Sequence, residues 1–187
     1  MRLRRVVPGV NFQSNDFELF ALVQQFAQDR SAIDARWKEL QREAHPDKFA
    51  AQGASAQRIA MQWSVRINEA YQRLKDPLRR AAYLCELNGA PVNAENNTAM
   101  PADFLTQQMQ WRESLEEATS LADVYEITSE LSDSKQALLQ KCESLLDHAH
   151  DYPAAVAQVR ALMFLDRFAS DVEKRLDELE SQFSRLL

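Results

Sequence analysis

The tripeptide His45-Pro46-Asp47 stands between two amphipathic segments and restricts how they can be connected. Pro46 has no amide hydrogen and disfavours the helical conformation at the residue before it, so a helix that reaches Ala44 must end there. Apolar residues recur at helical spacing on both sides of the tripeptide. The sequence therefore predicts a helix, an exposed turn that carries His45 and Asp47, and a second helix packed antiparallel to the first.

Further helical segments are predicted around this hairpin. A first helix begins at Asn15 or Asp16 and carries Phe17, Phe20 and Val23 on one face. The chain has only 3 glycines in 187 residues and is rich in strong helix formers, which favours an all-α fold. After Asp76-Pro77 another helix runs from Leu78 to Leu87. Three long helical segments follow at 101–119, 121–149 and 153–187, and Tyr125 belongs to the apolar stripe of the second. The predicted organisation is a basic tail at 1–10, a helical domain at 11–88, a linker at 89–99 and a three-helix bundle at 100–187.

Charge is distributed unevenly along the chain. Residues 1–88 carry 14 basic and 10 acidic side chains, whereas residues 89–187 carry 8 and 18. This asymmetry predicts two surfaces with different partners, although solvated acidic helix faces would explain part of it. The acidic half argues against nucleic-acid binding. No apolar run approaches the roughly 20 residues that span a bilayer, so we expect a soluble protein without a membrane segment.

The sequence shows no pattern typical of a metal site or of an enzyme. Cys85 and Cys142 stand on separate predicted helices without metal-ligand spacing, and we expect buried, reduced thiols in a cytoplasmic protein. A Walker loop and a nucleophile–base arrangement are both missing. We therefore expect neither a cofactor nor catalytic residues.

A basic patch is predicted beside the turn. It consists of Arg36, Lys38 and Arg42 on the outer side of the helix before the turn, together with Lys48 just after it. Lys38 and Arg42 are one helical turn apart and face the same way. The alternative is an ordinary solvated face, because two glutamates are interleaved with these residues.

The tripeptide, with a basic helix before it and a second helix after it, resembles the J-domain, which stimulates ATP hydrolysis by DnaK-type chaperones. A J-domain followed by a short linker and an acidic three-helix bundle resembles the HscB family of co-chaperones in iron–sulfur cluster assembly. The resemblance covers nearly the whole chain. It rests on five stretches, at residues 16–20, 41–49, 67–71, 76–84 and 160–166.

The resemblance implies two sets of binding residues. His45, Pro46, Asp47 and the basic patch would contact the chaperone HscA. The scaffold protein IscU would contact apolar and acidic residues on the first bundle helix and an aromatic residue on the last. Thr106 and Gln110 depart from the family pattern, which has an apolar residue and an acid at these positions. The scaffold-binding residues implied here are Leu105, Met109, Glu113, Glu117 and Phe164.

The function implied by the resemblance is that of an activator, which brings IscU to HscA and stimulates its ATPase. A J-domain adaptor for a different client and a purely structural helical scaffold are the alternatives. Leu105, Met109 and Phe164 could also be plain bundle core. We expect a monomer, although the apolar stripes of the bundle leave a dimer open.

Overall fold

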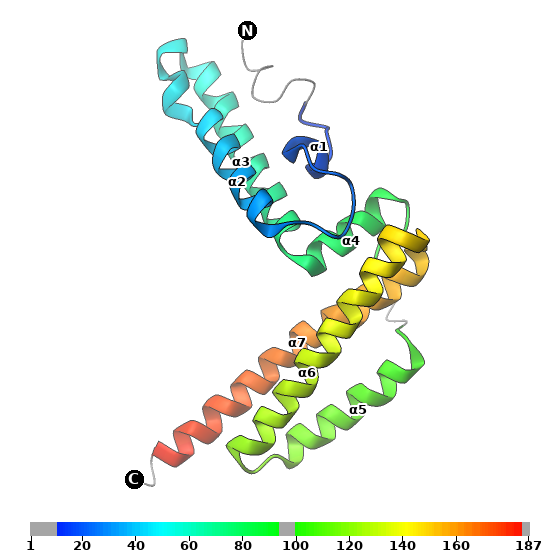
Figure 1. Cartoon of the computed structure of the whole chain (residues 1–187). Helices are drawn as coiled ribbons and strands as arrows, with labels where there is room; N and C mark the ends of the chain where they lie inside the picture. Colours follow the sequence, from blue (N-terminus) through cyan, green and yellow to red (C-terminus); the bar gives the residue numbers. More distant parts are fainter. Residues whose placement is uncertain (1–10, 94–99, 185–187) are drawn as a thin grey trace. The chain divides into compact units, whose positions relative to one another are not determined.

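The computed structural model describes residues 11–93 and 100–184, which form two compact units, Met1–Leu84 and Cys85–Leu187. The predicted all-α class is confirmed, since the described residues form helices and connecting segments without a strand (Figure 1). The basic tail predicted at 1–10 lies outside the described residues, as do residues 94–99 of the predicted linker. The predicted domain limits stay predictions.

Helix α1 (Asp16–Phe20) is shorter than predicted. It begins with a capping box in which the Asn15 side chain accepts from the Glu18 amide at 2.9 Å and the Glu18 carboxylate accepts from the Asn15 amide at 3.1 Å. It ends because Ala21 adopts a left-handed conformation with φ 53°. The predicted placement of Val23 on the apolar face was wrong, because its side chain is 69% exposed.

A buried carboxylate fixes α1 against helix α3 (Ala54–Lys75). Asp16 is fully buried, and its two oxygens lie 2.6 Å from Nη2 of Arg66 and 2.6 Å from Nε of Arg73. The amide of Asp16 also donates to the hydroxyl of Tyr83 at 3.0 Å. A buried charge is tolerated only when it is paired and hydrogen-bonded, so these partners account for its position in the core.

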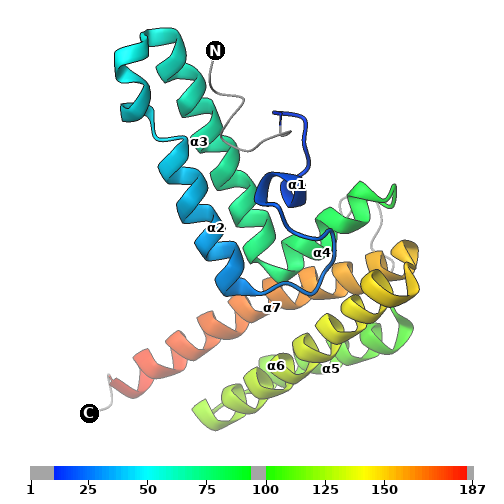
Figure 2. The same ribbon diagram turned by 45° about the horizontal axis from the view of Figure 1, so that its top comes forward.

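Helices α2 (Arg30–Glu43) and α3 form the predicted antiparallel hairpin and lie side by side in Figure 2. Asp29 caps α2, and its carboxylate accepts from the Ser31 amide at 2.8 Å. The turn between the two helices is the 3₁₀ segment η2 (Pro46–Gln52), followed by Gly53 at φ 92°. The fully buried side chains of the hairpin are Ile33, Leu40, Ala44, Ala60, Ile67, Ala70 and Leu74.

The second unit contains the predicted three-helix bundle, which is confirmed. Its helices are α5 (Ala102–Glu117), α6 (Leu121–Glu143) and α7 (Tyr152–Ser184), and the π-helical segment η3 (Ser144–Ala149) continues α6. Each of the three helices packs against the other two. From the part of the linker that is described, the carbonyl of Val92 accepts from Arg160 of α7 at 2.7 Å. Core residues include Phe104, Trp111, Val124, Leu131, Leu138, Val159, Leu162, Leu165 and Val172.

Both cysteines are buried and unpaired, as predicted. Burial disfavours the thiolate and raises the pKa of Cys85 to about 11 and that of Cys142 to about 12. Within residues 11–93 and 100–184, no group of three or more metal-ligating side chains could hold a metal ion. Over the same residues, no helix is long and apolar enough to span a membrane.

Candidate functional site

The His45-Pro46-Asp47 turn is exposed at one end of the α2–α3 hairpin. His45 precedes η2 in an extended conformation, and Pro46 occupies the first position of the segment, where no amide hydrogen is needed. Nδ1 of His45 accepts from the Asp47 amide at 3.3 Å. Oδ2 of Asp47 lies 3.6 Å from the same nitrogen, and 85% of the Asp47 side-chain surface is exposed. The exposed Asp47 carboxylate is therefore open to an external partner.

The residues of the basic patch differ in accessibility. Lys38, Arg42 and Lys48 are exposed, as a surface that meets an acidic partner requires. Arg36 is half-buried, with 23% of its side chain exposed, and it pairs with Glu39 at 3.1 Å. Successive helical residues are about 100° apart, so Arg36 points away from Lys38 and Arg42. The structure therefore brings together Lys38 and Arg42 and leaves Arg36 on a different side of α2.

Polar side chains of α3 hold the end of α2 that leads into the turn. The hydroxyl of Ser64 donates to the carbonyl of Ala44 at 3.2 Å, and the side-chain Nε2 of Gln41 donates to the backbone carbonyl of Ser64 at 3.2 Å. Asn68 accepts through Oδ1 from Gln41 at 2.7 Å and from Nε1 of Trp37 at 2.9 Å. The sequence did not predict this role for Ser64 or its partners. The available signal was the position of Ser64 and Asn68, one turn apart on α3 and each next to a core residue.

The predicted scaffold-binding residues of α5 lie on its solvent side. Leu105 and Met109 are 39% and 69% exposed, and Glu113 and Glu117 are exposed as well. The core of the bundle is instead filled from α5 by Phe104 and Trp111. Leu105 and Met109 are therefore not bundle core, and the four residues form one apolar and acidic stripe along the helix.

Phe164 on α7 connects this stripe to the core. Its ring makes an edge contact with Phe104 and stacks on Phe168, both with ring centroids 5.7 Å apart. The guanidinium of Arg112 lies 5.5 Å from the centre of the Phe164 ring. Because Arg112 is three residues after Met109 and seven after Leu105, it lies on the same side of α5 as both. Phe164 thus borders the stripe, and Arg112 is a neighbouring cation that the sequence analysis missed.

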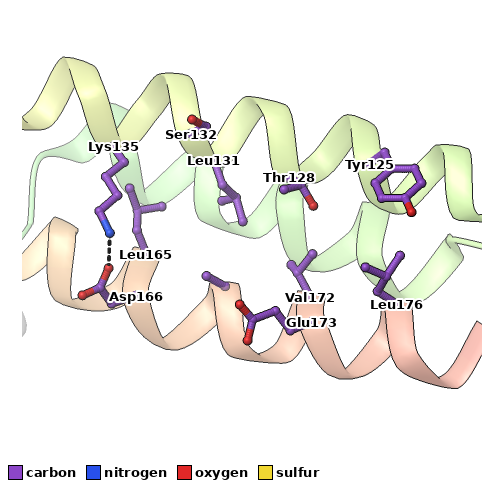
Figure 3. A pocket seen from close by; sticks show the side chains of 11 residues that line it. Tyr125, Thr128, Leu131, Ser132, Lys135, Leu165, Asp166, Val172, Glu173 and Leu176 are labelled. Atoms are coloured by element: carbon purple, nitrogen blue, oxygen red, sulfur yellow. Dashed lines mark hydrogen bonds and ion pairs between the residues drawn. The ribbon is translucent and has the colours of Figure 1, made fainter.

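A second apolar surface lies between α6 and α7. Figure 3 shows a groove lined by Leu131, Leu165, Val172 and Leu176, closed at one end by an ion pair between Lys135 and Asp166 at 2.7 Å. Tyr125 lies at its other end and is 54% exposed. Helical periodicity places Tyr125 in the apolar stripe of this helix, but its exposed side chain lies outside the bundle core.

Comparisons with known proteins agree on one family. A family model described as the HscB C-terminal oligomerisation domain matches residues 100–173. The chain is 48% identical over 175 residues to a co-chaperone protein HscB homolog from Burkholderia multivorans, covering 92% of this chain and 99% of that protein. The homolog from Burkholderia thailandensis is 48% identical over 174 residues, with 91% and 99% covered.

Two solved structures are similar over most of the chain. The chaperone HscB from Vibrio cholerae aligns with a TM-score of 0.77 at 35% identity and covers 89% of this chain and 99% of that one. The human co-chaperone HscB aligns with a TM-score of 0.82 at 24% identity, with 89% and 84% covered. The human protein supports the fold alone, because its sequence identity is low.

Proposed function

The chain belongs to the HscB family of co-chaperones, and we propose that it brings the iron–sulfur scaffold protein IscU to the DnaK-type chaperone HscA and stimulates the ATPase of that chaperone. The observation that carries this proposal is the exposed His45-Pro46-Asp47 turn. Asp47 presents an exposed carboxylate that can accept charge-assisted hydrogen bonds, which are about twice as strong as neutral ones. In this proposal the chain activates the chaperone, and HscA catalyses the hydrolysis.

The basic patch would guide the chaperone to the turn. Lys38, Arg42 and Lys48 are exposed cations close to the turn in sequence, and they would attract an acidic surface of HscA. Such charges accelerate association more than they strengthen the final complex. Arg36 would contribute least, because it is half-buried and already paired with Glu39.

The stripe on α5 would hold IscU. Leu105 and Met109 would supply the apolar contact area, and Glu113 and Glu117 would select a basic rim on the partner. Phe164 would complete the surface from α7. A chain that binds HscA and IscU at the same time raises the effective concentration of one near the other.

A different client is the second candidate function. Thr106 and Gln110 are exposed beside the stripe. Thr106 is less apolar than the residue of the family pattern, and Gln110 lacks the charge of the acid in that pattern. A J-domain adaptor with another client would keep the stimulation of a chaperone ATPase. It would bind IscU no better than an unrelated protein.

Binding to IscU tests the proposed scaffold site. We expect the double variant Leu105→Ala/Met109→Ala to weaken the complex by at least about tenfold, since truncation of central apolar contacts costs roughly 1–2 kcal/mol or more. Both side chains are exposed, so the bundle should keep its stability. Isothermal titration calorimetry with purified IscU would measure the change in Kd.

Tyr125→Ala is the matched control for this measurement. It removes an exposed apolar side chain from the same bundle but from the α6–α7 groove. We expect its Kd for IscU to equal that of the unmodified chain. Weaker binding by Tyr125→Ala together with full binding by the double variant would place the scaffold in the groove instead.

A further inference from the structure

The carbonyl that ends α2 is held by a residue of α3. The last carbonyls of a helix have no partner within the helix. Here the Ala44 carbonyl, directly before His45, accepts from the Ser64 hydroxyl at 3.2 Å, and the Ala44 side chain is fully buried. We propose that Ser64 is a positioning residue, which fixes the direction in which the chain leaves α2 and so the placement of the His45-Pro46-Asp47 turn.

Further hydrogen bonds hold Ser64 and its neighbours on α3 against α2. The backbone carbonyl of Ser64 accepts from the side-chain Nε2 of Gln41 at 3.2 Å, and the same nitrogen donates to Asn68 at 2.7 Å. Asn68 in turn accepts from the indole of Trp37 at 2.9 Å, and the Trp37 ring stacks on Tyr71 with centroids 4.7 Å apart. Together these contacts join the last two turns of α2 to the middle of α3.

The turn itself is exposed and carries two local hydrogen bonds to His45. The Asp47 amide donates to His45 Nδ1 at 3.3 Å, and the Lys48 amide donates to the His45 carbonyl at 3.1 Å. No side chain of the segment η2 is fully buried. The segment η2 also packs against α3, and the bond from Ser64 joins α3 to the residue directly before the tripeptide.

The Ser64 hydrogen bond would affect how tightly the turn binds HscA, and it would leave the chemistry of Asp47 unchanged. A turn that is ordered before binding loses less conformational entropy when it docks. This inference rests on the proposed stimulation of HscA. Loss of the anchor should raise the concentration of chain that half-saturates the ATPase by about three- to tenfold, with the maximal rate unchanged.

The experiment compares Ser64→Ala, which removes the hydroxyl donor, with Ser64→Thr, which keeps it. Gln72→Ala, an exposed amide on the same helix, is the control for general effects of substitution. One readout is the titration of HscA ATPase with each chain. The other is the ¹⁵N order parameters of the Asp47 and Lys48 amides, which report ordering of the turn without any partner.

The proposal expects lower order parameters and a higher half-saturating concentration for Ser64→Ala, with both restored in Ser64→Thr and unaltered in Gln72→Ala. Unchanged order parameters in Ser64→Ala would overturn it, as would a loosened turn without any change in half-saturation. If the unmodified chain fails to stimulate HscA, the proposed function fails, and the order parameters still decide whether Ser64 orders the turn.

Discussion

The Asp47→Asn variant is expected to stimulate HscA at least about thirtyfold less than the unmodified chain at equal concentration. Asparagine keeps the size of the side chain but removes the charge that would pair with a cation of the chaperone. Truncating one partner of a charged contact across an interface costs roughly 2–5 kcal/mol. The measurement is the steady-state rate of ATP hydrolysis by HscA at increasing concentrations of each chain.

A matched control separates the role of Asp47 from the loss of any negative charge near the turn. Glu43→Gln removes an exposed carboxylate in the last turn of α2, four residues before Asp47. We expect it to stimulate normally. Folding should be intact in both variants, because 85% of the Asp47 side-chain surface is exposed. Full stimulation by Asp47→Asn would exclude the turn as the chaperone-binding element.

Replacing Asp16 by alanine is expected to lower the free energy of unfolding of the first unit by about 3 kcal/mol. Removing one member of a buried ion pair leaves its partners without compensation, at a typical cost of roughly 3–5 kcal/mol. We expect a cost at the lower end of this range, because the Arg73 side chain is 41% exposed and can reach water. Arg66 is less able to do so, since 17% of its side chain is exposed and its Nη1 is buried without a hydrogen bond.

Amide hydrogen exchange at the core of α3 measures this change. Ile67 and Ala70 are fully buried, so we expect their amides to exchange through unfolding of the unit and their exchange rates to rise by about a hundredfold in Asp16→Ala. Asp47→Asn removes an exposed carboxylate from the same unit and should leave these rates unaltered. Equal exchange rates in Asp16→Ala and the unmodified chain would show that the ion pairs of Asp16 with Arg66 and Arg73 contribute nothing to stability.

Much of the fold was predictable because helical periodicity is a local signal. The hairpin and the bundle followed from apolar residues at helical spacing, and Pro46 determined where α2 ends. The first helix was predicted too long because periodicity continues through Val23, while the left-handed conformation of Ala21 ends the helix. Nothing in the type of that residue signals it, since alanine favours helices.

The candidate sites were predictable to a different extent. The exposed turn followed from Pro46, whereas the stripe of Leu105 and Met109 came from a family pattern, and the structure places both at the surface. The anchoring role of Ser64 was not predictable, because it depends on contacts between residues some 20 positions apart. Tyr125 was misplaced because an apolar stripe wider than the helix contact includes residues at its edge.

We propose that one chain couples IscU to HscA through two separate surfaces. The rate of ATP hydrolysis by HscA should be measured with the chain alone, with IscU alone and with both. We expect both together to raise the rate beyond the sum of their separate effects. We also expect Leu105→Ala/Met109→Ala to lose this synergy but to keep the stimulation by the chain alone. Purely additive effects of the unmodified chain and IscU would show that the chain does not couple the two proteins.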